Sequence, residues 1–368
     1  MSTSSIISPV EQKRSQKDAH SSFTRLPVVD VAPLYSDDLD ARRAAAASLG
    51  TAVRDSGFFY AVGHQVPESD MKQLILRART FFALSLEAKM QWYIGNSKHH
   101  KGYVPEGEEV FDGGTKDRKE AFDLGCDLPE DDPDVLAGTP TLGPNVWPDV
   151  EGFQRDVQAY YGSMAAFRQV LFRGFALSLG LEENFFGRYT IKPPSQLRLL
   201  HYPYNPDSVD APGIGAHTDY ECFTILLPTA PGLEVLNGAG NWIDAPPLEG
   251  AFIVNIGDMM EIWTNGEYVA TSHRVRRVRE ERYSFPMFCA CDYHTVVEPL
   301  PQFVGPDRPP RYQPVSAGAH LLAQTAQSFS YLKRRIAAGE LVLPAGSRPL
   351  SSFGRIARSD ADSNSEAV

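Results

Sequence analysis

Two histidines and one aspartate are the residues of this sequence best suited to chemistry. His217 and Asp219 stand two positions apart at the head of GAHTDYECFTILL, an apolar run rich in β-forming residues, and His273 follows later in YVATSHRVRRV. In an extended strand, side chains two positions apart point to the same face. His217 and Asp219 would therefore aim an imidazole and a carboxylate at one point, where His273 from a second strand can join them.

These three side chains predict a metal site. One His-x-Asp triplet can arise by chance, and the alternative for all three is a buried, hydrogen-bonded trio, but an unpaired buried carboxylate is costly. Two imidazoles and one carboxylate occupy one face of an octahedron and leave three positions open, a set typical of non-haem Fe(II) oxygenases. We therefore expect His217, Asp219 and His273 to be both metal ligands and catalytic residues.

A second constellation follows in ERYS, where Arg282 and Ser284 would share one face of a strand with Tyr283 opposite. A guanidinium beside a hydroxyl can bind a carboxylate through charge-assisted hydrogen bonds, and Tyr202 in LLHYP is a third candidate contact. The cosubstrate would then be a dicarboxylate, held at its other end by iron. The alternative is a solvent-exposed strand, because more arginines lie nearby. These are Arg274, Arg276, Arg277 and Arg279.

Five further residues are candidates for a substrate pocket. Tyr220 and Glu221 directly follow the metal motif, so they could line the space next to the metal. Tyr103, Phe122 and Phe288 are aromatic candidates for the same pocket. All five are predictions for contacts to the primary substrate.

Other polar residues near these motifs are expected to have no part in the chemistry. Asp258 in IGDMM is expected to form a turn rather than to bind metal. His64 and His201 are expected to be structural, as most single histidines are. His99 and His100 lie in the loop sequence SKHHKGY, where a surface position is expected.

A helical N-terminal half and a β-rich C-terminal half are expected to position these residues. Apolar residues at helical spacing predict helices over about residues 40–54, 69–85, 150–179 and 317–338. After Gln196 the chain changes to short β-type runs separated by turn residues, and Asn265-Gly266 between two such runs predicts a hairpin. This pattern predicts an α+β fold whose mainly β core is a double-sheet jelly roll or a small barrel.

The chain divides into four parts by composition. Residues 1–24 and 346–368 are polar and low in apolar content, which predicts flexible tails. Residues 25–145 form an expected N-terminal region. Residues 146–340 form an expected core that contains the long helix and the jelly roll, and the two regions are expected to pack as one unit.

The overall charge excludes some classes of partner. The 368 residues carry a formal net charge of −11, which argues against nucleic acid or an anionic membrane, because both favour a basic surface. No apolar run reaches the length of a membrane span, and the polar N-terminus does not look like a secretory signal. The 4 cysteines are too few for a disulfide framework in a chain this long. We expect a cytoplasmic protein with a small-molecule substrate.

The motifs together resemble a known family. His217-x-Asp219, His273 and Arg282-x-Ser284, flanked by LRLLHYP, VNIGDMMEIWTNGEY and HRV, are similar to the 2-oxoglutarate/Fe(II) dioxygenases of the isopenicillin N synthase-like superfamily. LPVVDV, GFFYAVGH, KGYVPEGEE and KEAFDLG resemble the leading region of that family. The resemblance covers roughly residues 26–335, and its motifs look closer to fungal and bacterial members than to plant flavonoid enzymes.

The resemblance implies a fold, cofactors and a reaction. The fold would be a double-stranded β-helix with flanking N-terminal helices, a long helix and a C-terminal helix. His217, Asp219 and His273 would bind Fe(II), and Arg282 and Ser284, with help from Tyr202, would bind 2-oxoglutarate, with O2 as second cosubstrate. The enzyme would oxidise an unactivated C–H bond of a small organic molecule, release succinate and CO2, and serve secondary metabolism.

Two other functions stay open at this point. Isopenicillin N synthase itself keeps a similar Arg-x-Ser pair without using 2-oxoglutarate, so Arg282 could instead bind the carboxylate of the substrate in an Fe(II) oxidase. A more remote alternative is a jelly-roll binding protein without catalysis. The sequence leaves open the substrate, the oligomeric state, and the choice between hydroxylation, desaturation and cyclisation.

Overall fold

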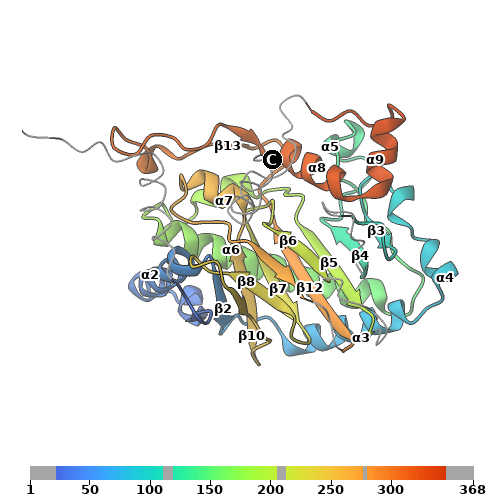
Figure 1. The fold of residues 1–368 in the computed structure, drawn as a ribbon, viewed down its shortest axis with the longest axis horizontal. Helices are drawn as coiled ribbons and strands as arrows, with labels where there is room; N and C mark the ends of the chain where they lie inside the picture. The colour runs from blue at the N-terminus through green and yellow to red at the C-terminus, as the bar shows by residue number, and fades with distance from the viewer. Residues whose placement is uncertain (1–21, 111–118, 205–212, 277–279, 345–368) are drawn as a thin grey trace, which may run out of the picture.

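An eight-stranded sheet runs through the centre of the structure (Figure 1), a computed structural model that describes residues 22–110, 119–204, 213–276 and 280–344. The strands in spatial order are β1 (Val28–Asp30), β2 (Phe58–Val62), β10 (Ala251–Ile256), β7 (Phe223–Pro228), β12 (Arg282–Cys289), β5 (Gln196–Tyr202), β4 (Glu120–Gly125) and β3 (Gly102–Val104). β1 and β2 are parallel, and the other neighbours are antiparallel. Strands from the N-terminal region and from the core therefore share one sheet.

A four-stranded antiparallel sheet carries the two predicted histidine ligands. Its order is β6 (Ile214–His217), β11 (His273–Val275), β8 (Leu233–Leu236) and β9 (Trp242–Asp244). A third, two-stranded sheet pairs β13 (Val296–Val297) with β14 (Val315–Ser316). The two larger sheets agree with the predicted α+β fold with a jelly-roll core.

Three helices cover the large sheet with apolar side chains. They are α2 (Leu39–Ser56), α3 (Glu68–Phe82) and α6 (Phe153–Ser178), of which α6 contacts both others. The side chain of Asp38 caps α2 by accepting a hydrogen bond from the amide of Asp40, and Gly57, at φ 69°, ends it in the left-handed conformation. The apolar residues that recur at helical spacing along α6 form one buried stripe. Its members are Phe153, Val157, Tyr160, Met164, Phe167, Leu171 and Phe175.

The C-terminal helical segment differs from its prediction. The single helix expected over residues 317–338 is two helices, α8 (Ala317–Ser328) and α9 (Ser330–Ala337). They are separated by Phe329, whose backbone is extended at φ −85° and ψ 124°. The break lets both helices pack beside the β3–β4 end of the large sheet (Figure 1), where the amide of Val110 donates to the carbonyl of Ser328.

The hairpin predicted at Asn265-Gly266 is wrong. The run before it is a short helix, α7 (Asp258–Trp263), and all of its residues are buried. Because the run is short and its apolar residues do not alternate with polar ones, its sequence does not distinguish a helix from a strand. The amide nitrogen of the Asn265 side chain donates to the carbonyls of Phe303 and Pro309, at 3.0 and 3.1 Å. The left-handed turn at Asn265 and Gly266 thus ends a helix and anchors a later loop.

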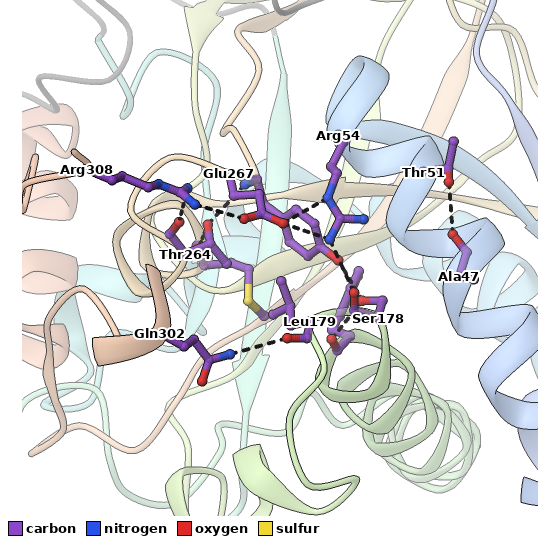
Figure 2. Close-up of polar contacts among 12 residues, drawn as sticks. Ala47, Thr51, Arg54, Ser178, Leu179, Thr264, Glu267, Gln302 and Arg308 are labelled. Carbon is purple, nitrogen blue, oxygen red and sulfur yellow. Dashed lines mark hydrogen bonds and ion pairs between the residues drawn. The ribbon is translucent and has the colours of Figure 1, made fainter. Parts of the chain in front are cut away.

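Charged side chains fasten this turn to the N-terminal helices (Figure 2). Glu267 accepts from Arg54 of α2 at 2.8 Å and from Arg308 at 3.1 Å. Arg308 also donates to the carbonyl of Thr264 at 3.1 Å, and Arg54 to the carbonyl of Ser178 at 3.2 Å. The carboxylate of Glu267 therefore joins the segment after α7 to α2 and to Arg308, and Arg54 in turn contacts the end of α6.

The predicted tails lie outside the described residues, apart from residues 22–24. Phe23 is in contact with the core, and its carbonyl accepts a hydrogen bond from the side chain of Asn237 at 2.9 Å. All four cysteines fall in the described part of the chain and are free. Among the described helices, none combines the length and the apolar character that a membrane span requires.

Candidate active site

The three predicted metal ligands come together between strands β6 and β11. His217 ends β6, His273 begins β11, and the two residues are direct partners in the antiparallel register. Asp219 lies two residues after His217, and its Oδ1 is 3.7 Å from Nε2 of His217 and 3.6 Å from Nε2 of His273. One atom from each residue lies within 4.8 Å of the others, so the trio could hold a single metal ion.

Backbone carbonyls orient both imidazoles. Nδ1 of His217 lies 2.8 Å from the carbonyl oxygen of Gly215, and Nδ1 of His273 lies 3.1 Å from that of Thr271. Because a carbonyl only accepts, each Nδ1 carries a proton, and each Nε2 is the ring nitrogen that faces Asp219. Both rings are therefore oriented so that Nε2 would be the ligand atom of a bound metal.

Two neighbouring side chains hold the carboxylate. Oδ2 of Asp219 accepts from the hydroxyl of Thr224 at 2.5 Å and from the amide of Asn255 at 2.7 Å. These bonds occupy one carboxylate oxygen and leave Oδ1 directed at the histidines. Burial alone would raise the pKa of Asp219, but His273, His217 and the bond from Asn255 hold it well below its usual value.

The histidines differ in their electrostatic surroundings. Burial, and then the neighbouring His273, lower the pKa of His217 to about 4, so this ring is neutral at pH 7. Burial also acts to lower the pKa of His273, but the adjacent Asp219 outweighs it and raises that pKa. A metal ion would compete with a proton mainly at His273.

Asn255→Ala should weaken metal binding without removing a ligand. Asp219 would lose one of its two side-chain donors and with it part of its fixed orientation, and the loss of such a supporting group typically costs about 10- to 100-fold in metal affinity. Anaerobic titration with Fe(II) measures the change. Asn237→Ala is the matched control, because Asn237 is equally buried but bonds only to the β8–β9 turn and to Phe23. Equal losses in both variants would contradict a specific role for Asn255.

Arg282 and Ser284 lie on β12, opposite strand β5, and are 1% and 2% exposed. Arg282 is the register partner of Tyr202, and its guanidinium carbon lies 4.8 Å from the centre of the tyrosine ring. Nε of Arg282 donates to the carbonyl of Ala230, whereas Nη1 is buried without a hydrogen-bond partner among the described residues. Burial lowers the pKa of Arg282, as expected for a cation that has no counter-ion in the described part of the chain.

A cavity of about 620 Å³ joins this pair to the three metal ligands. Arg282, Ser284 and Tyr202 line it, together with His217, Asp219 and His273. An anion with two carboxylates could therefore contact both groups at once. The alternative of a solvent-exposed strand is wrong for Arg282, although Arg274 pairs with Glu234 on the half-exposed side of β11. Arg277 and Arg279 lie outside the described residues.

Sequence comparison gives the family. The description "non-haem dioxygenase in morphine synthesis N-terminal" matches residues 26–150, and "2OG-Fe(II) oxygenase superfamily" matches residues 193–290. The 2-oxoglutarate-Fe(II) type oxidoreductase hxnY of Emericella nidulans is 33% identical over 321 residues, which are 83% of this chain and 91% of the relative. The chain belongs to the 2-oxoglutarate/Fe(II) oxygenase superfamily.

Solved structures agree with this assignment. A putative 2OG-Fe(II) oxygenase family protein from Caulobacter crescentus has a TM-score of 0.72 and 30% identity, and the match covers 86% of this chain and 99% of the other. A full-length Neurospora crassa protein, solved in complex with alpha-KG, has a TM-score of 0.70 and 25% identity, with 87% and 98% covered; it has also been solved with alpha-KG and thymine. The jelly-roll fold is confirmed. The protein is an oxidoreductase that uses Fe(II), 2-oxoglutarate and O2, and the two alternative functions are not favoured.

A second cavity of about 520 Å³ adjoins the metal ligands of this oxygenase. Three of the five predicted pocket residues, Tyr220, Glu221 and Phe288, line it together with His217 and Asp219. Further wall residues come from the loops on either side of β3, from β5 and from the C-terminal helical segment. They are His100, Glu109, Gln196, Arg198, Leu321, Thr325, Ser328 and Phe329.

Tyr103 and Phe122 are not part of either cavity, so their assignment to the pocket is wrong. The hydroxyl of Tyr103 donates to Glu120 at 2.6 Å, and its ring packs against Phe81. Phe122 packs against Phe81 and Phe153 on the helix-covered face of the sheet. Because side chains alternate along β4, it is Asp123, the next residue, that points toward the cavity side, where it pairs with Arg198.

Two of the cavity residues that the sequence did not predict, His100 and Arg198, carry ionisable side chains with clear partners. His100 was expected at the surface, but its ring is packed against Phe329, its Nδ1 lies 2.5 Å from the hydroxyl of Tyr331, and burial lowers its pKa to about 3. Arg198 forms ion pairs with Glu109 and Asp123 beside the metal ligands. A signal for Arg198 was present, because in LRLLHYP it stands four positions before Tyr202 and therefore on the same strand face.

Asp258 connects the metal loop to a C-terminal helix. It begins helix α7 rather than forming the expected turn. Its carboxylate accepts from the hydroxyl of Thr218 at 2.9 Å and lies 3.1 Å from Nε2 of His320 on α8. Its amide donates to the carbonyl of Asp219 at 2.9 Å. The helix that walls the second cavity is thus fastened to the loop that carries Asp219.

Proposed function

We propose that His217, Asp219 and His273 bind the Fe(II) of this oxygenase, and that Arg282 and Ser284, with Tyr202 beside them, bind the 2-oxoglutarate carboxylate remote from the metal. The observation that carries this proposal is one cavity lined both by the three ligands and by a buried guanidinium whose Nη1 has no partner among the described residues. A buried cation of this kind is stabilised by an anion that accepts its free donors.

Iron, when bound with 2-oxoglutarate and O2, supplies the oxidising power to break a C–H bond. The protein's own residues prepare the site for it. The two imidazoles direct their Nε2 atoms toward the place of the metal, and Thr224 and Asn255 fix the carboxylate of Asp219. Apolar side chains exclude water around the cosubstrate. They are Phe58, Leu226, Leu233 and Val275.

The primary substrate is proposed to be a small organic molecule in the second cavity. Tyr220, Glu221 and Phe288 would contact it, since they line this space together with His217 and Asp219. Oxidation of an unactivated C–H bond there, with release of succinate and CO2, fits a substrate that lies beside the iron without binding to it. A cytoplasmic location belongs to the same proposal, supported by the four free cysteines.

Anaerobic addition of Fe(II) and 2-oxoglutarate to the full chain tests this function. We expect one iron per chain and a weak visible charge-transfer band that requires 2-oxoglutarate and does not form with succinate or with Zn(II). Admission of O2 should then release succinate. Iron binding without the band would contradict the proposed binding of 2-oxoglutarate, and failure to bind iron would contradict the metal site.

A further inference from the structure

We propose that Glu221 selects substrates that carry a cationic nitrogen, such as a protonated amine, on an apolar or aromatic frame. The inference rests on the proposed function, because it takes the second cavity as the place of the primary substrate. It concerns a side chain that neither the metal ligands nor the 2-oxoglutarate contacts require.

Glu221 lies in the turn between β6 and β7, two residues after Asp219. It is 6% exposed, and its carbonyl accepts from the amide of Met259 at 3.0 Å, so its main chain is held in place by α7. It lines the 520 Å³ cavity beside the metal ligands and also an adjoining cavity of about 390 Å³. A carboxyl therefore stands where the two cavities meet.

The lysine and the arginine that line these cavities already have partners within the protein. Arg198 pairs with Glu109 and Asp123. The ammonium of Lys101 donates to the carbonyls of Cys126 and Gly143 at 2.7 and 2.5 Å. Because these groups already have ion-pair or hydrogen-bond partners, a substrate would add little to their stabilisation.

Glu221 differs from them. Among the described residues, no side chain forms an ion pair with its carboxyl or donates a hydrogen bond to it, and only the backbone amides of Tyr220 and Glu221 stabilise it. A buried carboxyl that lacks a cationic partner costs free energy in the absence of substrate. A ligand that brings a positively charged N–H group would remove that cost and form a charge-assisted hydrogen bond.

The shape and lining of the two cavities define the rest of the ligand. Both are lined by Glu221, His100, Gln196, Leu321 and Thr325, so they form one continuous space. Its walls near the iron ligands carry aromatic and aliphatic side chains that can cover an apolar frame. They are Tyr220, Phe288, Leu321 and Phe329. Such a pocket buries the frame and uses its few polar groups for orientation.

Matched probes test the inference by binding rather than by turnover. The full-length holoprotein is titrated calorimetrically, with Fe(II) and 2-oxoglutarate present and O2 excluded. The ligands are two sets of three small molecules, and the members of each set differ only in their polar group. These are tryptamine, tryptophol and indole-3-propionate, and benzylamine, benzyl alcohol and phenylacetate. We expect each amine to bind roughly 10- to 100-fold more tightly than its alcohol or carboxylate.

Glu221→Gln should abolish this preference, because the amide keeps the size of the side chain but cannot form the carboxylate that pairs with a cation. Thr325→Ala is the control, since Thr325 lines both cavities and carries no charge; its preference for amines should persist. The inference is overturned if no amine binds up to millimolar concentration, if alcohols or carboxylates bind as tightly, or if Glu221→Gln retains the preference. Loss of the preference for amines in Thr325→Ala would also overturn the inference.

The same titration separates this inference from the proposed function. The affinity for 2-oxoglutarate is measured first, on wild type and on both variants, by its charge-transfer band. A wild type without that band contradicts the proposed function itself. A normal band together with no preference for amines contradicts only the role of Glu221.

Discussion

Replacement of His273 by alanine should abolish stoichiometric Fe(II) binding and lower 2-oxoglutarate-dependent succinate release by more than about 100-fold. Loss of a group that merely supports a ligand typically costs about 10- to 100-fold in metal affinity, and loss of the ligand itself should exceed this. His273 faces His217 across the β6–β11 pair, so its removal leaves only two ligand side chains. Metal analysis after anaerobic loading, followed by a succinate assay, measures both effects.

His294→Ala is the control for the loss of a histidine. His294 has an exposed side chain that pairs with Asp134, outside both cavities, so this variant should keep its iron and its turnover. Circular dichroism of the His273→Ala protein checks that the fold is retained. Full iron occupancy in a folded His273→Ala protein would refute the proposed metal site.

Arg282→Ala should chiefly raise the concentration of 2-oxoglutarate that the enzyme requires. The guanidinium is 1% exposed, and truncation of one partner of a buried charged pair costs about 2–5 kcal/mol, or roughly 30-fold to several thousand-fold in affinity. Iron binding should be preserved, because Arg282 does not contact the three ligands. Titration of the charge-transfer band and of the initial rate with 2-oxoglutarate gives the change.

Two further variants make the result for Arg282 specific. Arg274→Ala removes an arginine of β11, whose side chain pairs with Glu234 and lies over Trp242. This variant should leave the 2-oxoglutarate requirement unchanged. Arg282→Lys keeps the charge but loses the two-pronged geometry, so it should fall between wild type and Arg282→Ala. An unaltered requirement in Arg282→Ala would favour an oxidase in which 2-oxoglutarate has no part.

Strand periodicity explains why the ligands could be predicted from sequence. His217 and Asp219, and likewise Arg282 and Ser284, are two positions apart, so a local rule places each pair on one face. The pairing of His217 with His273 is different, because it depends on which strands become neighbours. For this step the prediction rested on the ligand chemistry of two imidazoles and one carboxylate, and the family resemblance then supported it.

The wrong predictions have a common physical origin. Tyr103 and Phe122 lie on short strands where every residue is buried, so composition does not distinguish the cavity face from the core face. The same ambiguity turned the buried helix α7 into a predicted hairpin strand. His100 was assigned to the surface because its loop is polar, but α9, far away in sequence, covers it through Tyr331.

The arrangement of α8 and α9 implies that substrate selection and oxidation depend on different segments of the oxygenase. These helices and the residue between them contribute Leu321, Thr325, Ser328 and Phe329 to the substrate cavity, yet none of the side chains proposed to bind iron or 2-oxoglutarate. Substitutions there can reshape what the enzyme accepts while the oxidising centre on the sheets stays intact. Substitutions confined to this C-terminal segment can thus change substrate selectivity during evolution, while the residues proposed to bind iron and 2-oxoglutarate stay the same.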